Sequence, residues 1–324
     1  EKIDIHVSSL NEQMWRIEQK MRSNPDGRPE DLIEYDSQRG GIDRRTRNDL
    51  ARGRQTLRSG TIRKSAYRPF VMLNCYFDPG RQLNNDVYQL PHVFPTPRHP
   101  NLAVAVNSDR RKVGLPLLSA TLPNLHFNGD AQCFPLYTWE KMPDSEPGEL
   151  SLWGSARSTA DGDSGAGEDT ANLTFDFSKP IGEQVPSFID GYQRRDNITD
   201  ATLAAYREHY GDEGSPSGEQ ITKEDIFFYV YALLHHPDYR ERYEADLKKM
   251  LPRIPMVPGF WEFSDIGRDL ADLHVNYEKV EPYPITESWA LDAPTDEWDK
   301  YRVDKLAWGK SGQSSRSEER FSRN

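Results

Sequence analysis

The sequence is poor in cysteine and has no long hydrophobic run. Its 324 residues include two cysteines, Cys75 and Cys133, too few for a disulfide framework, which indicates a reducing compartment. The longest apolar run, Ile226 to Leu234, is about half the length that a membrane helix needs. No G-x-x-x-x-G-K-[ST] loop occurs, so the sequence lacks the usual phosphate cradle of an ATPase. These absences argue against a disulfide-stabilised scaffold and a membrane-spanning protein, and they predict a cytoplasmic location.

Acidic residues outnumber basic ones overall, but basic residues are concentrated in one segment. The net charge is −11 and the mean hydropathy is −0.83, whereas nucleic-acid binders are usually basic. A solvent-exposed helix face is the ordinary explanation of a charged block, but ten cations against two acids exceed what solvation requires. We therefore favour a surface that contacts phosphates. The block, with a net charge of +8, contains Arg39, Arg44, Arg45, Arg47, Arg52, Arg54, Arg58, Arg63, Lys64 and Arg68 against Asp43 and Asp49.

Alternating and apolar patterns predict strands in the first two thirds of the chain. We expect one mixed or antiparallel sheet over roughly residues 67–177, with a helix from Ile198 to Tyr210 following it. The residue before Pro69 should be extended, since a following proline disfavours the α region. The predicted strands are VMLNCYF at 71–77, LAVAV at 102–106, ATLPNLHF at 120–127, CFPLYTW at 133–139 and residues 172–177.

Apolar residues at helical spacing predict three helices between Thr222 and Tyr277. Thr222 is the expected N-cap of the first helix, because carboxylates follow it in the first turn. Pro237 ends that helix and Pro252 ends the second, which carries an apolar stripe from residue 239 to residue 251. The third helix spans residues 263–277. The fold class expected from this order of elements is α+β, a mixed or antiparallel β-sheet with a C-terminal helical cluster.

Composition divides the chain into four expected parts. They are an N-terminal helical and basic connecting segment (1–66), a β-rich region (67–215), a helical cluster with an irregular segment (216–308), and a polar tail (309–324). A Gly, Ser, Asp and Glu rich stretch at 144–170 is expected to be a long flexible loop.

Several ordered motifs resemble one protein family. The helical region contains D-I-F-x-Y-V-Y-A-L-L-H-x-P-x-Y-R-x-x-Y from Asp225, then L-P-R-I-P, then I-G-R-x-L-x-x-L-H ending at His274. Earlier in the chain, S-x-Y-R-P-F precedes a strand that ends in Y-F-D. This set resembles the C-terminal specificity domain of Type ISP restriction-modification enzymes. Glu1 stands where a complete protein would begin with methionine, and similar sequences continue past the end of this one, so we expect a piece of a longer chain.

The resemblance implies sequence-specific recognition of double-stranded DNA. The nuclease, the helicase-like ATPase and the adenine methyltransferase would be upstream domains of the same polypeptide, and AdoMet, ATP and Mg would be bound there. This fragment shows neither a glycine-rich AdoMet loop nor an Asn/Asp-Pro-Pro-Tyr/Phe motif, so we expect no catalysis and no cofactor in it. The expected partners are DNA and the methyltransferase domain. An alternative is a structural module that couples the methyltransferase to the rest of the enzyme with little base readout.

The candidate DNA-contacting residues are basic and lie before strands or in turns. Arg68 has two open roles, pairing with a core carboxylate or contacting DNA. Arg110 and Arg111 occupy a turn, where guanine readout and phosphate contact are both possible. The full set is Arg44, Arg45, Arg47, Arg52, Arg54, Arg63, Lys64, Arg68, Arg110, Arg111 and Lys112.

Other chemically suggestive residues are better explained by structure. His235 and His236 are adjacent on a helix, so their side chains point about 100° apart and suit a single metal ion poorly. We expect core packing for His274 and burial for Cys75. The G-D-S-G sequence around Ser164 resembles a serine-protease motif, but no positioned histidine and aspartate accompany it.

Overall fold

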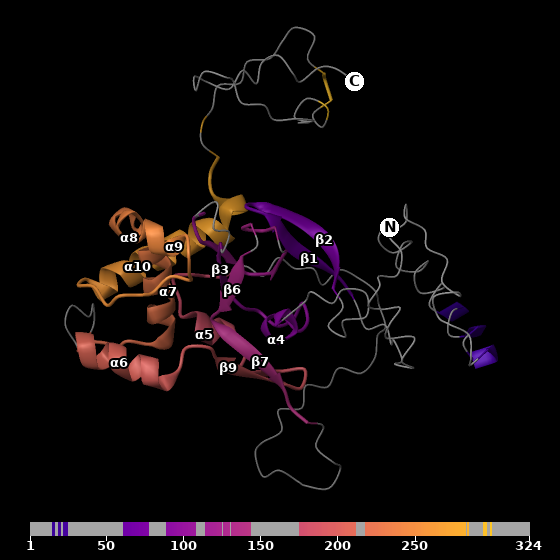
Figure 1. Cartoon of the computed structure of the whole chain (residues 1–324), viewed down its shortest axis with the longest axis horizontal. Coiled ribbons are helices and arrows are strands. Elements are labelled where there is room, and N and C mark those ends of the chain that lie inside the picture. The colour runs from indigo at the N-terminus through magenta and orange to yellow at the C-terminus, as the bar shows by residue number, and fades with distance from the viewer. Residues whose placement is uncertain are drawn as a thin grey trace. The chain divides into compact units, whose positions relative to one another are not determined.

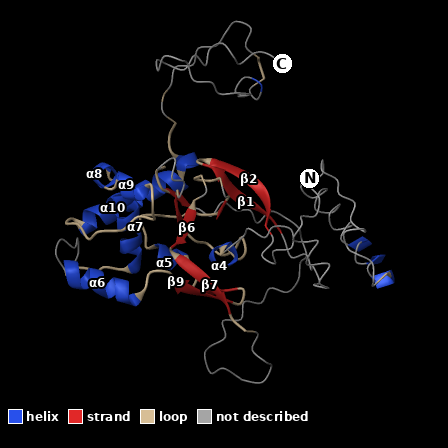
Figure 2. Cartoon of the chain, viewed as in Figure 1, coloured by secondary structure: helices blue, strands red, loops and turns tan. Residues whose placement is uncertain are grey.

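The computed structural model describes part of the chain. The described residues are 15–16, 19–20, 22–24, 61–77, 89–107, 114–124, 126–129, 131–143, 175–211, 218–282, 284, 294–296 and 299. The chain divides into two compact units, residues 1–279 and 280–324, and the elements below belong to the first. Small sheets and a helical cluster make it an α+β fold, as predicted (Figures 1 and 2).

The first sheet is a hairpin extended by one short strand. Strands β1 (Thr61–Arg68) and β2 (Val71–Phe77) pair antiparallel, and β5 (Leu122–Pro123) adds to β1 in parallel. The strand predicted at 71–77 and the extended residue before Pro69 are both confirmed. In the strand predicted at 120–127, Leu122 and Pro123 are the only described residues that form a strand.

Two further sheets are antiparallel. The second has the order β4–β3–β6, with β4 at Leu117–Ser119, β3 at Ala103–Val106 and β6 at Gln132–Pro135. The third has the order β7–β9–β8, with β7 at Tyr137–Lys141, β9 at Tyr192–Asp196 and β8 at Phe188–Ile189. The expectation of one sheet was wrong, because the strand predicted at 133–139 breaks at Leu136.

Local hydrogen bonds account for this break and for a missing strand. The Asn101 side chain donates to the Tyr137 carbonyl and accepts from the Tyr137 N–H, so it replaces a strand partner where β6 ends and β7 begins. In the segment predicted as a strand at 172–177, the described residues 175–177 form a loop. Phe175 and Phe177 are buried, but the Asp176 N–H donates to the Gln184 side chain instead of to a neighbouring strand.

The helical cluster follows the predicted order. The Thr222 hydroxyl accepts from the Asp225 N–H and the Asp225 carboxylate accepts from the Thr222 N–H, a capping box that starts α7. The segment predicted to form the second helix forms two short helices, which are separated at Tyr243. The helices are α4 (Leu90–Val93), α5 (Ile181–Gln184), α6 (Asp200–Tyr210), α7 (Lys223–His235), α8 (Pro237–Arg242), α9 (Glu244–Leu247), α10 (Phe260–Val275) and the 3-10 turn η1 (Tyr277–Lys279).

One hydrophobic core joins the second and third sheets to the helical cluster. It contains Leu102 from β3, Trp139 from β7, Phe228 from α7 and Ala271 from α10. This core includes residues on both sides of position 215, and β1 runs through the position 66 at which composition suggested a boundary. None of the described helices is long and apolar enough to cross a bilayer.

Candidate functional site

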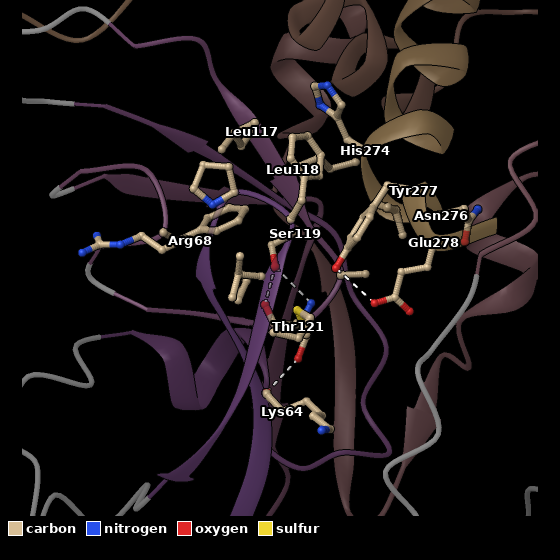
Figure 3. A pocket seen from close by; sticks show the side chains of 18 of the residues that line it. Lys64, Arg68, Leu117, Leu118, Ser119, Thr121, His274, Asn276, Tyr277 and Glu278 are labelled. Atoms are coloured by element: carbon tan, nitrogen blue, oxygen red, sulfur yellow. Dashed lines mark hydrogen bonds between the residues drawn. The ribbon is translucent and has the colours of Figure 1, made fainter. Parts of the chain in front are cut away.

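A cavity of about 170 Å³ lies between the β1–β2 hairpin, β4 and the end of the helical cluster. We refer to it as the hairpin cavity. Figure 3 shows Tyr277 reaching into it from the C-terminal side of α10, with Lys64 and Arg68 on the hairpin side. Arg68, Phe70 and Glu278 are exposed, so the cavity is open to solvent there. Its apolar and aromatic lining includes Ala66, Phe70, Met72, Leu117, His274 and Tyr277.

The charged side chains that line the cavity are mostly cationic. Four are cations, namely Arg63, Lys64, Arg68 and Lys279, and one is the carboxylate of Glu278. Their net charge of +3 contrasts with −11 for the whole chain. A concave surface of one sign concentrates ligands of the opposite sign, so the hairpin cavity favours an anionic ligand.

Arg63 belongs to the protein interior. Its side chain is 6% exposed, its guanidinium donates to the Phe94 carbonyl at 2.6 Å, and it lies 5.2 Å from the centre of the Phe77 ring. Burial lowers the pKa of Arg63 to about 10, which leaves it charged at neutral pH. This arrangement gives no support to a DNA contact by Arg63, although it was among the residues proposed from sequence.

The tip of the hairpin holds a backbone conformation that is unusual for an aromatic residue. Arg68 pairs with Val71 across a two-residue turn, Pro69 and Phe70, and Phe70 has φ of 60°. Proline followed by a positive φ is the pattern of a type II turn, which favours glycine or asparagine at the second position. Such strain costs about 1–3 kcal/mol and persists only where the surroundings hold it.

Aromatic contacts supply that support for Phe70. Its ring lies 5.2 Å from the ring of Tyr277 and 5.8 Å from that of His274, both in edge-on geometry. The Phe70 side chain is nevertheless 49% exposed, so part of its ring faces the open side. Residues from the hairpin tip and from the end of the helical cluster therefore form one aromatic wall.

Lys64 and Arg68 occupy the hairpin side of the cavity. The Arg68 guanidinium donates to the His126 carbonyl at 3.1 Å and lies 4.8 Å from the centre of the Tyr67 ring. Neither of the two predicted roles of Arg68 is contradicted, but no carboxylate among the described residues pairs with it. The ammonium group of Lys64 likewise makes no ion pair within the described ranges, so both cations remain available to a ligand.

The opposite wall holds a histidine and a tyrosine that are both neutral at physiological pH. His274 Nδ1 and the Tyr231 hydroxyl are hydrogen-bonded to each other. Burial lowers the pKa of His274, and nearby His235 lowers it further. Burial raises the pKa of Tyr277, whose hydroxyl donates to Glu278 at 3.3 Å. The wall therefore presents one neutral hydroxyl donor beside one carboxylate.

Many of the predicted contact residues lie outside the described residues. Of the basic set, the structure brings Arg63, Lys64 and Arg68 to one cavity. Sequence reasoning missed Phe70, His274 and Tyr277 as parts of this site. The S-x-Y-R-P-F motif was the available signal, because it unites Arg68 and Phe70. Outside the described residues lie Arg44, Arg45, Arg47, Arg52, Arg54, Arg110, Arg111 and Lys112, together with the predicted loop 144–170 and Ser164.

The other suggestive residues have structural partners. His235 contacts the carbonyls of Tyr231 and Pro116 at 2.8 and 3.0 Å, whereas the His236 ring lies near Phe263, so the two histidines diverge. Among the described residues, no group of three or more histidine, cysteine or acidic side chains is placed to hold a metal ion. Burial raises the pKa of Cys133 to about 11, which makes it a poor nucleophile.

Comparison with known proteins identifies one family. The family model of the Type ISP C-terminal specificity domain matches residues 5–320. The DrdV–DNA complex shares 28% identity and a TM-score of 0.58 over 90% of this chain and 23% of that one. A nuclease-deletion mutant of the Type ISP enzyme LlaGI, in complex with a DNA substrate mimic, shares 25% identity and a TM-score of 0.57 over 96% and 22%.

A third structure shows the same fold. The Type ISP enzyme LlaBIII bound to DNA is 20% identical, with a TM-score of 0.56 over 88% of this chain and 15% of that one. The chain therefore spans less than a quarter of the length of each of these structures. No curated protein sequence matches it.

Proposed function

The chain belongs to the Type ISP C-terminal specificity domain family, and we propose that it recognises a short sequence in double-stranded DNA. The observation that carries the proposal is the excess of cations around the hairpin cavity in a chain of net charge −11: apart from the internal Arg63, the lining has Lys64, Arg68 and Lys279 against Glu278. DNA-bound structures similar to this chain support the same conclusion. Lys64 and Arg68 would contact phosphates and set the register on the duplex.

The basic segment before the hairpin and the predicted turn after β3 would complete the DNA-binding surface. Arg44, Arg45, Arg47, Arg52 and Arg54 precede the hairpin in sequence, and Arg110, Arg111 and Lys112 follow β3. Phosphate contacts would supply most of the affinity, whereas base edges in the major groove would supply the specificity. We leave Arg63 out of this surface because its guanidinium is bonded inside the protein.

The catalytic steps would belong to other domains of a longer polypeptide. A nuclease, a helicase-like ATPase and an adenine methyltransferase would bind Mg, ATP and AdoMet, and this domain would hold the target for the methyltransferase. The small share of the similar structures that the chain covers supports this division of labour.

The direct test is selection of bound duplexes from a random pool at two salt concentrations. We expect one short asymmetric motif to be enriched and to persist at the higher salt. Weak binding with a steep salt dependence and no motif would contradict autonomous recognition, since phosphate contacts alone behave in that way.

Neutralising the two hairpin cations tests their role. The Lys64→Ala/Arg68→Ala double variant should bind the selected duplex more weakly, and its slope of log K against log salt should be lower by about two. Fluorescence anisotropy over a salt series measures both quantities. A matched control is Lys248→Ala, whose ammonium group pairs with Glu244 on the surface of the helical cluster. An unchanged slope in the double variant would exclude phosphate contacts by these two residues.

A coupling role for the domain is favoured by one observation on α10. Ile266 and Leu273 are each 51% exposed and lie seven residues apart, which places them on one face of the helix. Such a face suits docking to the methyltransferase domain. Charge reversal at Arg44, Arg45, Arg47, Arg52 and Arg54 discriminates the two functions, because it abolishes DNA binding only if the domain itself holds the duplex.

A further inference from the structure

We propose that the hairpin cavity binds a single unpaired pyrimidine base of DNA, with its flanking phosphates at Lys64 and Arg68. This inference rests on the proposed function and names the part of the ligand that the cavity takes. Four properties of the cavity support it, namely its volume, its aromatic wall, the donor and acceptor pair at one edge, and its cations.

The volume of the cavity suits a ligand with a single six-membered ring. The cavity measures about 170 Å³, and an apolar protein cavity of about 150 Å³ holds one benzene molecule. A six-membered pyrimidine ring therefore fits within this volume, whereas a fused purine pair of rings would extend beyond it through the open side. Ala66 contributes to this room, since it lines the cavity on the strand between Lys64 and Arg68.

The aromatic wall suits a planar ligand. Phe70 contacts Tyr277 and His274 edge-on, at interplanar angles of 68° and 67°, so none of these contacts is a parallel stack. Ring faces are therefore left on which a base can stack, and the partly exposed ring of Phe70 lies on the open side. Stacking of unpaired bases on aromatic side chains is a common mode of binding to single-stranded nucleic acid.

Tyr277 and Glu278 place a hydroxyl donor and a carboxylate acceptor side by side at one edge of the cavity. The Ser119 hydroxyl donates to the Thr121 carbonyl and the Thr121 hydroxyl donates to the Lys64 carbonyl, so both hydroxyl protons are already used. Tyr277 and Glu278 are joined only by a long bond of 3.3 Å. They offer a donor beside an acceptor, which complements the adjacent acceptor and donor on the pairing edge of a pyrimidine.

Lys64 and Arg68 are placed to bind the phosphates that flank the base on the same DNA strand. Lys64 and Arg68 line the cavity on the hairpin side, and Figure 3 shows Glu278 on the side away from Arg68. The carboxylate is thus placed toward the base and the guanidinium toward the backbone. A base that enters past Phe70 would bring its own phosphates to this positive rim.

The test measures binding of the chain to duplexes that differ at one position. Fluorescence anisotropy compares a fully paired duplex with duplexes that carry one bulged thymidine, one bulged adenosine or one bulged abasic site. We expect the thymidine bulge to bind roughly tenfold more tightly than the abasic bulge. The abasic bulge has the same flexibility and phosphates, so the difference isolates the base. The adenosine bulge should show no such gain.

Two variants test whether the preference for the thymidine bulge depends on the aromatic wall of the cavity. Phe70→Asn removes the aromatic ring but keeps a residue that tolerates positive φ, and Tyr277→Ala removes the opposite ring from a different element. Both should abolish the preference for the thymidine bulge while circular dichroism shows a folded chain. Leu73→Ala is the matched control, because Leu73 is an exposed apolar residue of the same hairpin outside the cavity. It should retain the preference.

Each contrary result has a distinct meaning. Equal binding of thymidine and abasic bulges, with paired duplex still bound, would overturn the base site and leave DNA recognition intact. An equal gain for adenosine would overturn the selection by size. A preference that survives both Phe70→Asn and Tyr277→Ala would place the base elsewhere. Failure to bind any duplex would overturn the proposed function together with this inference.

Discussion

Arg268 of α10 forms ion pairs that connect this helix to α7. Its guanidinium lies 2.6 Å from the Glu224 carboxylate and 2.8 Å from that of Asp225, over the ring of Phe228. Both carboxylates are largely buried, and Glu224 also accepts two backbone N–H groups at the start of α5. Burial alone would lower the pKa of Arg268, but the two carboxylates together raise it. The guanidinium therefore compensates two buried negative charges.

Removing that guanidinium should strongly destabilise the fold. We expect Arg268→Met to lower the free energy of unfolding by about 3 kcal/mol, because the methionine keeps the packing volume and leaves two buried carboxylates unpaired. Urea denaturation at neutral pH measures the change. Lys248→Met, which breaks the exposed pair with Glu244, should alter stability little. Comparable losses in both variants would show that the burial of the Arg268 cluster has no energetic consequence.

The histidine beside the hairpin cavity should make stability depend on pH. Burial lowers the pKa of His274 below its ordinary value of 6.5, so the unfolded chain binds the proton more readily. The contribution of neutral His274 to the free energy of unfolding is therefore complete above about pH 6.5. It is lost as the pH falls through the lower pKa that His274 has in the folded chain.

Unfolding by urea at about pH 7.5 and about pH 5.5 measures this dependence. His274→Gln should show a smaller decrease in stability at the lower pH than the native chain. His92→Gln serves as the control, because His92 is exposed. A decrease of the same size in His274→Gln as in the native chain would assign the pH dependence to other groups.

At the scale of elements, the helical cluster depends on how closely α10 approaches α7. Gly267 faces the backbone of α7, and a Cβ atom at that position would lie 2.0 Å from the Phe228 carbonyl oxygen. Backbone atoms cannot yield as a flexible side chain can. The I-G-R part of the sequence motif thus combines a contact that only glycine allows with the arginine that binds Glu224 and Asp225. The two residues together set where α10 lies on α7.

Gly267→Ala should separate these helices despite the better helix propensity of alanine. We expect a loss of about 1–3 kcal/mol in the free energy of unfolding, since overpacking outweighs the gain of about 1 kcal/mol from replacing a helical glycine. Thermal unfolding followed by circular dichroism measures it. Asp269→Ala, at an exposed position of the same helix, should change stability by less than about 0.5 kcal/mol. A stabilised Gly267→Ala variant would contradict the close approach.

At the scale of the whole molecule, the second and third sheets share one core with the helical cluster. Leu102 and Trp139 from the strands pack in the same cluster as Phe228 and Ala271 from α7 and α10. A surface that reads DNA must hold its loops and cations in fixed positions, and a common core provides that rigidity. Under the proposed function, the acidic balance of the chain would keep nonspecific attraction to DNA low, and the cations on the hairpin side would direct the approach.

The shared core predicts that strands and helices unfold together. Hydrogen exchange followed by mass spectrometry should give the same opening free energy for the amides of β7 and β9 as for those of α7. Amides of the exposed β1–β2 turn should exchange through smaller openings. Distinct opening free energies for β7 and α7 would instead support separate domains divided near residue 215.

Helices were more predictable than sheets because their signals are local. The capping box at Thr222, the proline after His236 and the apolar spacing of α10 lie within one or two turns of each helix, so the start, end and type of α7 were predictable. Which strands pair was not predictable, because pairing is decided by distant residues. Asn101 breaks the expected strand at Leu136 from 35 positions earlier in the chain.

The sequence by itself determined the family, the α+β class and the helical cluster, because those depend on ordered motifs and short-range periodicity. It also marked Lys64 and Arg68 as candidate contacts by their charge. Only the tertiary structure decided that the Arg63 guanidinium is bonded inside the protein, whereas the ammonium group of its neighbour Lys64 is available at the hairpin cavity. Neighbouring residues of a strand point to opposite faces, and only the packing of the sheet decides which face is buried. The same holds for Phe70 and Tyr277, which are about 200 residues apart in the sequence and whose rings meet where the hairpin tip lies beside the end of α10.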